Sequence, residues 1–212
     1  MNKFNNLLEK MTVSIKPEID KFQEYYLNSM LTDVKLINTV VRYISKRKGK
    51  QFRPRLCILS AKICGEVNEN TYKAASLIEM IHVATPIHDD VVDESKKRRG
   101  NLTANEVWGN KTSVLVGDFL FSRAFQLMAK YGNNTVLKLL SDTSVIISEG
   151  EMLELSNDKD ITINEDIYFR VINGKTASLF SSACQVGAIS GKATKEKIDA
   201  LKSFGTNFGM SF

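Results

Sequence analysis

Apolar residues recur at intervals of three and four positions along almost the whole chain, and this spacing constrains the fold more than any other feature. Side chains at these intervals share one face of an α-helix, whereas strand-like alternation is scarce and only three prolines occur in 212 residues. We therefore expect an all-α fold. The expected helices cover residues 3–31, 34–47, 53–65, 70–94, 103–108, 111–130, 133–155, 164–186 and 194–212.

Length and composition indicate one globular domain, residues 1–212. Hydrophobic residues make up 43% and charged residues 25%, which excludes a disordered or fibrous class. The three cysteines, Cys57, Cys64 and Cys184, lie on apolar helical patterns without CxxC spacing, so we expect core residues rather than disulfides or a zinc site. No apolar run reaches the ~18 residues of a membrane span, and the N-terminus lacks a long apolar segment. We expect a cytoplasmic protein without a membrane span.

The formal charge of +5 restricts the class of partner, and much of it lies in residues 46–55 and 96–99. Nucleic-acid binding would call for basic stripes interleaved with aromatic residues, or a recognisable motif, and neither is present. A diphosphate-bearing substrate explains the positive charge equally well. We therefore expect no nucleic-acid partner, and a basic helical nucleic-acid binder is kept only as an alternative.

Two aspartates near the end of the expected helix 70–94 form the first candidate site. Asp89 and Asp93 are four residues apart, so both carboxylates lie on one helix face and can hold one cation, while Asp90 points elsewhere. Like charges at this spacing repel, and both lie at the negative end of the helix dipole. A divalent ion with phosphate oxygens in its coordination sphere, such as Mg²⁺, would offset this repulsion. The alternative is a solvated acidic helix end neutralised by residues 96–99.

Two local signals concern the same helix. Asn70 can cap its start. Pro86 lies inside it, where the ring removes one backbone hydrogen bond and crowds the carbonyl of His82, at a cost of roughly 3 kcal/mol. We expect a kink just below the aspartates; the alternative is a helix that starts afresh there.

A basic turn, residues 49–54, forms a second candidate site. Lys50, Arg53 and the free N–H groups at a helix start, where Pro54 suits the first turn, could converge on an anion. Arg98 and Arg99 form another basic pair that ends in Gly100, a residue suited to positive φ. Two cationic clusters flanking one metal site imply two separate phosphate groups.

Taken in order, these motifs resemble the trans-isoprenyl (polyprenyl) diphosphate synthases, in particular octaprenyl-type members. Residues 49–54 (GKQFRP) are similar to the family's GKxxRP turn, and residues 89–100 (DDVVDESKKRRG) to its first aspartate-rich motif. Further matches follow in family order at residues 117–120 (GDFL), 149–151 (EGE), 175–177 (KTA) and 204–212. The resemblance implies a helical bundle of the isoprenoid synthase type around a central cavity, and a homodimer.

The resemblance also implies residue roles. Isopentenyl diphosphate would be held by Lys50, Arg53, His82 and Arg99. Asp89 and Asp93 would bind Mg²⁺ that bridges an allylic diphosphate, and the same leaving group would contact Arg98, Lys175 and Thr176. The catalytic set would then be Asp89, Asp93 and Lys175.

Plain structural alternatives exist for several of these residues. His82 could be a satisfied core histidine, Lys175 a surface side chain, and Thr176 a residue that bonds its own helix backbone. Glu151 and Glu154 lie one turn apart and could hold metal-bound water or form an exposed acidic face.

The chemistry implied is prenyl transfer. The allylic diphosphate ionises when Mg²⁺, lysine and arginine stabilise the departing charge, and the double bond of isopentenyl diphosphate attacks the cation. Product length should depend on the helix below Asp89, where Thr85 lies beside Ala84 one turn down and Ile81 two turns down. Each turn spans about 5.4 Å, comparable to one isoprene unit. Short-chain members carry bulky aromatics here, so we predict a medium- to long-chain polyprenyl diphosphate.

The resemblance stops with the sequence, after residues 209–212, where the family has a second aspartate-rich motif. We expect a C-terminally truncated enzyme that is weak or inactive by itself. The alternative is a non-catalytic regulatory or scaffold subunit, which would not need the basic and acidic site residues that this chain retains.

Overall fold

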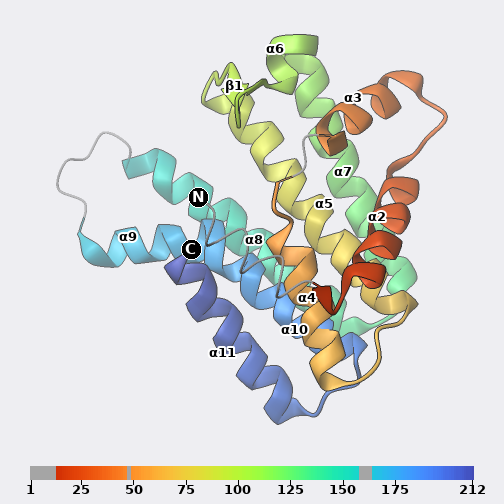
Figure 1. The fold of residues 1–212 in the computed structure, drawn as a ribbon. Coiled ribbons are helices and arrows are strands. Elements are labelled where there is room, and N and C mark those ends of the chain that lie inside the picture. Colours follow the sequence, from red (N-terminus) through yellow and green to blue (C-terminus); the bar gives the residue numbers. More distant parts are fainter. Residues whose placement is uncertain (1–12, 47–48, 158–163) are drawn as a thin grey trace.

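The computed structural model describes residues 13–46, 49–157 and 164–212, and this part of the chain is almost entirely helical (Figure 1). The expected all-α fold is confirmed. The elements in chain order are α2 (Lys16–Met30), α3 (Lys35–Lys46), α4 (Phe52–Cys64), α5 (Glu69–Val92), β1 (Lys97–Arg98), β2 (Asn101–Leu102), α6 (Ala104–Trp108), α7 (Asn110–Tyr131), α8 (Asn134–Asn157), α9 (Glu165–Ile172), η1 (Asn173–Ala177), α10 (Ser178–Ser190) and α11 (Lys195–Ser211). The first part of the helix expected over 3–31 lies outside the described residues.

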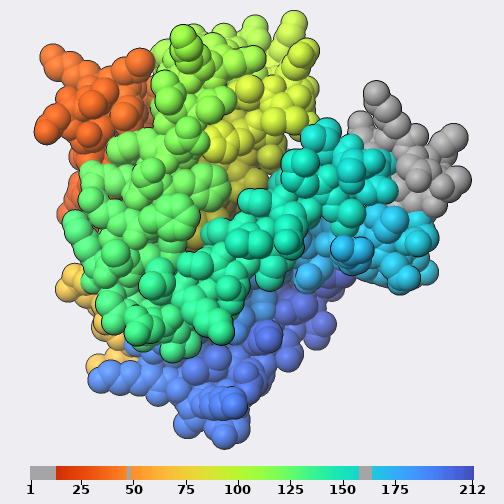
Figure 2. Space-filling view, turned by 180° about the vertical axis from the view of Figure 1, so that it is seen from behind, coloured from red at the N-terminus to blue at the C-terminus, as the bar shows by residue number. Residues whose placement is uncertain are grey.

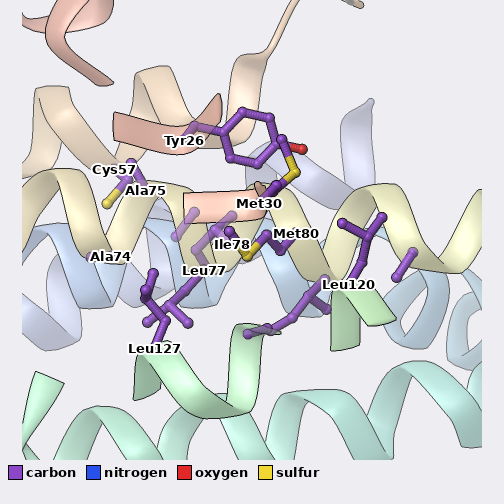
Figure 3. Close-up of a cluster of buried hydrophobic side chains, with 14 of the residues drawn as sticks. Tyr26, Met30, Cys57, Ala74, Ala75, Leu77, Ile78, Met80, Leu120 and Leu127 are labelled. Atoms are coloured by element: carbon purple, nitrogen blue, oxygen red, sulfur yellow. The ribbon is translucent and has the colours of Figure 1, made fainter. Parts of the chain in front are cut away.

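The long helix α5 is at the centre of the molecule (Figure 1). Its buried side chains pack on α7 and α2, and Figure 3 shows Leu77 and Ile78 between Leu120 and Leu127 on one side and the end of α2 on the other. Burying one such large apolar side chain contributes about 1.5–3 kcal/mol. The aspartates therefore stand at the end of a helix that the core holds firmly.

The start and the middle of α5 differ in part from expectation. The capping residue is Asn68, not Asn70: its side-chain oxygen accepts from the backbone N–H of Asn70, and Thr71 completes a capping box. The helix continues without interruption through Pro86, so the alternative of a fresh start there is wrong. The kink itself stays a prediction.

Two segments have shapes that the sequence did not indicate. Residues 97–102 form a short antiparallel hairpin in which Lys97 pairs with Leu102, and its turn places Arg99 at φ 51° and Gly100 at φ 78°. The helix expected over 164–186 is divided: α9 leads into a π-helical turn, η1, and then into α10. Both segments carry site residues.

Helices α4 and α10 approach each other closely beneath the site. A Cβ atom at Gly187 would lie 2.1 Å from the backbone oxygen of Cys57, so only glycine allows this approach. Cys57 and Cys184 are buried, as expected, Cys64 is half-buried, and all three thiols are free. No helix in the described part of the chain is both long and apolar enough to cross a membrane.

Candidate active site

A cavity of about 850 Å³ opens between the start of α4, one face of α5 and the β1–β2 hairpin. On α5 the lining residues repeat every three or four positions, which is one helix face. The walls also bring together six of the predicted site residues: Lys50, Arg53, His82, Arg98, Arg99 and Thr176. The basic turn and the hairpin, more than forty residues apart in sequence, thus face one space.

Arg53 and His82 form a pair within this cavity. Arg53 Nη1 donates to His82 Nε2 at 3.3 Å, and the guanidinium carbon lies 4.3 Å from the centre of the Phe180 ring. Burial lowers the pKa of Arg53 to about 10, with Glu79 acting against it and Arg99 adding to it. Burial, and then the neighbouring arginines, lower the pKa of His82 to about 3. His82 is therefore neutral at pH 7 and holds the arginine in place.

The Nε atom of Arg53 is a further feature of this cavity. It is buried and has no hydrogen-bond partner. A buried donor without a partner costs free energy, and a donor to a charged acceptor gains the most when it finds one. A phosphate oxygen in the cavity would satisfy it.

Arg99 reaches the basic turn because residue 49 is glycine. A Cβ atom at Gly49 would lie 2.1 Å from Arg99 Nη1, so the guanidinium lies directly on the backbone of the turn. The left-handed conformation of Arg99 aims the side chain there from the hairpin. The sequence identified both residues but not their contact.

Asp90 points away from the other two aspartates, as expected. It is buried, and its Oδ1 accepts from Arg98 Nε at 2.8 Å. Its backbone oxygen accepts from the side chain of Asn105 at 3.1 Å. Asp90 thus fastens the hairpin and α6 to α5. The sequence analysis missed this role and placed Arg98 on the substrate alone.

Asp89 and Asp93 lie at the end of α5, outside the walls of the cavity. Asp93 is the C-cap, immediately after the last helical residue Val92, and its N–H donates to the Asp89 carbonyl at 2.8 Å. Burial raises the pKa of Asp89 to about 6; Glu151 and Asp93 add to this, against Lys175 and Arg98. Burial, more than the neighbouring charges, thus disfavours the charged form of Asp89, and a divalent cation would stabilise that form.

Lys175 already interacts with part of this acidic cluster. Its Nζ lies 2.9 Å from Glu151 Oε2 and also bonds Glu154. Burial lowers the pKa of Lys175, but the hydrogen bonds with both glutamates outweigh burial and raise it. Oε1 of Glu151 is buried without a partner. Among the residues that the structure describes, no group of three or more histidine, cysteine and acidic side chains is arranged to hold a metal ion.

The position of Lys175 depends on two glycines. A Cβ atom at Gly174 would lie 2.8 Å from the Cα of Gly150, so η1 and α8 touch backbone to backbone. This contact brings Lys175, in the π-helical turn, opposite the glutamates of α8. Thr176, the next residue, lines the cavity. Lys175 therefore contacts the acidic cluster, while its neighbour Thr176 lines the basic cavity.

The three residues predicted to control product length lie elsewhere. Ile81 and Ala84 are buried in the main core, and Thr85 is half-buried with its hydroxyl bonded to the Ile81 carbonyl at 3.0 Å. The basic cavity follows the neighbouring face of α5 instead, through Val83 and Ile87. Ile81, Ala84 and Thr85 are therefore not among the residues that line the basic cavity.

An aromatic wall and one buried acid were missed by the sequence analysis. Phe212 lies 5.2 Å from Phe180 and 5.4 Å from Phe52, ring centre to ring centre, beside the basic residues. The four-residue spacing of Phe204, Phe208 and Phe212 was the available signal. Glu79, only 6% exposed, faces the cavity one turn before His82.

Comparison with known proteins identifies the family. A family model described as polyprenyl synthetase matches residues 34–212. The chain belongs to the polyprenyl synthetase family. Octaprenyl diphosphate synthase of Escherichia coli (strain K12) is 42% identical to it over 205 residues, which are 97% of this chain and 64% of that protein. The all-trans-nonaprenyl-diphosphate synthase (geranyl-diphosphate specific) of Rhodobacter capsulatus is 45% identical over 181 residues, 84% of this chain and 55% of that protein.

Solved structures of this family share the fold. A decaprenyl diphosphate synthase from Rhodobacter capsulatus superposes with a TM-score of 0.93 at 40% identity, covering 96% of this chain and 63% of that one. A polyprenyl synthase from Caulobacter crescentus CB15, complexed with calcium and isoprenyl diphosphate, gives 0.92 at 36% identity and covers 95% and 62%. The predicted family and helical bundle are confirmed, and this polyprenyl synthetase chain spans just under two thirds of the length of these relatives.

Proposed function

We propose that this chain carries the diphosphate-binding part of a trans-polyprenyl diphosphate synthase. The reaction joins isopentenyl diphosphate to an allylic diphosphate and releases diphosphate. The observation that supports this best is the pair of adjacent sites, one basic and one acidic, with Lys175 and Thr176 between them. Two diphosphates need two such regions, because only one of them leaves and only the leaving one gains charge in the transition state.

The basic cavity would take isopentenyl diphosphate. Arg53 and Arg99 present planar forks to phosphate oxygens, Lys50 adds a third cation, and the unpartnered Nε of Arg53 would gain a bond. His82, being neutral, would orient Arg53 and accept its N–H rather than add charge. The aromatic wall would exclude water from the prenyl end.

The acidic cluster would bind the metal. Asp89 and Asp93 carry carboxylate oxygens at one helix end, and a divalent cation would stabilise the charged form of Asp89, which burial disfavours. We propose Mg²⁺, which is commonly held by one or two carboxylates together with substrate phosphates, and which would stabilise the charge on the departing diphosphate. Arg98, Lys175 and Thr176 would contact the same group.

Product, assembly and compartment follow from the same proposal. The octaprenyl and nonaprenyl names of two relatives support a medium- to long-chain product, with Ile81, Ala84 and Thr85 below the aspartates. We also propose a homodimer, since Leu115 and Val145 on α7 and α8 are more than half exposed. Free thiols in all three cysteines support the cytoplasm.

The test is incubation with Mg²⁺, labelled isopentenyl diphosphate and farnesyl diphosphate. Two proteins should be compared, this chain and a version extended by the remaining C-terminal part of the E. coli octaprenyl diphosphate synthase. We expect extended products from the longer protein and none once Asp89 and Asp93 are both changed to asparagine. A longer protein that folds, binds isopentenyl diphosphate and yet makes no product would contradict the proposal and favour a non-catalytic subunit.

A further inference from the structure

Positive charge is concentrated in one stretch of the chain. Residues 34–65 contain nine lysines and arginines and no aspartate or glutamate. Because the whole chain has a formal charge of only +5, all other residues together are net negative. The cavity and a salt bridge account for part of the stretch, through Lys50, Arg53 and Lys62. In the described part of the chain, the cations of α3 neither line the cavity nor form a salt bridge.

Helix α3 has three kinds of surface. Val40 and Val41 are buried against the core. Lys35, Arg42 and Lys46 are exposed. At its start Val34 is 51% and Leu36 is 50% exposed. Figures 1 and 2 show α3 projecting at the end of the molecule that also carries the hairpin and α6, far from the first turns of α11.

The helix is held in a fixed orientation. Tyr43 donates its hydroxyl to the Leu102 carbonyl at 3.0 Å and packs edge-on against Trp108, with ring centres 4.7 Å apart. Asn38 bonds both backbone groups of Thr32, at 3.0 and 2.6 Å. Tyr43 and Ile44 also line the basic cavity. The outer face of α3 is therefore held in a fixed orientation, on the helix whose Tyr43 and Ile44 line the cavity.

We propose that the outer face of α3, formed by Val34, Lys35, Leu36, Arg42 and Lys46, docks on an anionic lipid bilayer. A helix with cations on its polar face and exposed aliphatic side chains at one end matches the chemistry of the bilayer interface. Anionic headgroups attract each nearby lysine or arginine, while the two apolar side chains can enter the acyl boundary. Nucleic acid fits less well, since Tyr43 is turned inward and no exposed aromatic residue is available on this helix to stack on a base.

Docking would place the end of the molecule that carries α3 at the membrane surface. Under the function proposed above, the product carries a long apolar tail, and a nearby bilayer would receive it. This consequence rests on the proposed function, but the docking itself does not.

The test is flotation of the 212-residue chain with vesicles of equal parts phosphatidylglycerol and phosphatidylcholine, compared with phosphatidylcholine alone. The test variant changes Lys35, Arg42 and Lys46 to glutamine. The matched control changes Lys195, Lys197 and Lys202, which are exposed on α11, and removes the same charge. Circular dichroism checks the fold of each variant. A further variant, Leu36→Ser, tests the apolar contact in about 0.5 M salt, where charges are screened.

Each cation near the surface changes lipid partitioning about fivefold, so the α3 variant should bind the anionic vesicles about a hundredfold more weakly. The α11 variant should lose only a few fold, and Leu36→Ser should weaken the binding that persists in salt. Equal losses in both triple variants, or no binding of the unchanged chain to anionic vesicles, would overturn the proposal. Binding to a DNA duplex that depends on α3, without binding to vesicles, would also overturn it and assign the surface to nucleic acid. None of these outcomes depends on catalysis.

Discussion

The ionisation of Asp89 should be visible in the stability of the protein. In the folded chain burial and Glu151 raise its pKa from 3.8 to about 6, so the folded state holds this proton more tightly than the unfolded state does. Asp89 therefore contributes stability that is fully present below about pH 4 and is lost as the pH rises through about 6. At pH 7, in divalent-free buffer, the charged carboxylate destabilises the fold.

The change in the free energy of unfolding can be calculated from the shift in the Asp89 pKa. About two pH units correspond to about 3 kcal/mol, and because Asp89 is half-exposed we reduce this to about 1–2 kcal/mol for solvent screening. Asp89→Asn cannot ionise. Relative to the unchanged chain, the variant should therefore gain about 1–2 kcal/mol of stability between pH 4 and pH 7, or about 2–8 °C in Tm.

The assay is urea and thermal unfolding in EDTA at pH 4, 5, 6 and 7, followed by a repeat at pH 7 with MgCl₂. Asp142→Asn, at an exposed position on α8, is the matched control, and its stability relative to the unchanged chain should not vary with pH in this way. Added Mg²⁺ should stabilise the unchanged chain and not Asp89→Asn, since ligand binding to the folded state alone raises stability. A relative stability of Asp89→Asn that stays constant or falls from pH 4 to pH 7 would refute the reasoning.

Three further predictions concern the cavity and its supports. Arg53→Lys loses the bond to His82 and the contact with Phe180, so isopentenyl diphosphate should bind about 10–100-fold more weakly by calorimetry, with Arg55→Lys as a control outside the cavity walls. His82→Gln should remove acid sensitivity: burial and the arginines lower the folded pKa to about 3, so His82 contributes stability above about pH 6.5 that is lost toward pH 3, and unfolding curves over this range should flatten in the variant. Gly174→Ala should lower stability by about 1–3 kcal/mol, because its Cβ would lie 2.8 Å from Gly150 Cα, and an unchanged Tm would contradict the close packing of η1 on α8.

The helices could be predicted from the sequence because one signal dominates it. Apolar spacing of three and four residues recurs in each long helix, and burial of that face is what stabilises a helix in a folded protein. The cap of α5 was ambiguous, since Asn68 and Asn70 both precede the apolar pattern. Thr71 decides between them, because it can return a bond to the backbone N–H of Asn68 but not to that of Asn70.

The hairpin and the π-helical turn could not be predicted, because both depend on contacts made in three dimensions. Residues 97–102 contain only one apolar side chain, Leu102, and show no alternation; the buried carboxylate of Asp90 fixes them through Arg98. The π-helical turn of η1 contains Gly174, which lies against Gly150, twenty-four residues earlier in the chain. Sequence spacing carries no information about either contact.

The same limit applies to the candidate site. The sequence supplied the charged residues, and the family resemblance assigned them to a substrate, yet in the folded chain several of these cations already have protein partners. Arg98 bonds Asp90, Arg53 bonds His82, and Lys175 bonds Glu151 and Glu154. These bonds hold the cations in place, so under the proposed function less conformational freedom would be lost when a diphosphate binds.

Lys175 is the cation whose protein partners lie nearest to the proposed metal site. Its two glutamate partners are acidic neighbours of Asp89, and Glu151 is among the groups that raise the Asp89 pKa. With Lys175 in place, the cluster is partly neutralised by a cation of the chain itself. A divalent ion at Asp89 and Asp93 would supply that charge instead and would weaken the hold of the glutamates on Lys175. Under the proposed function, the ammonium group would then be available to the diphosphate that arrives with the metal, and the acidic cluster would couple metal binding to the release of this lysine.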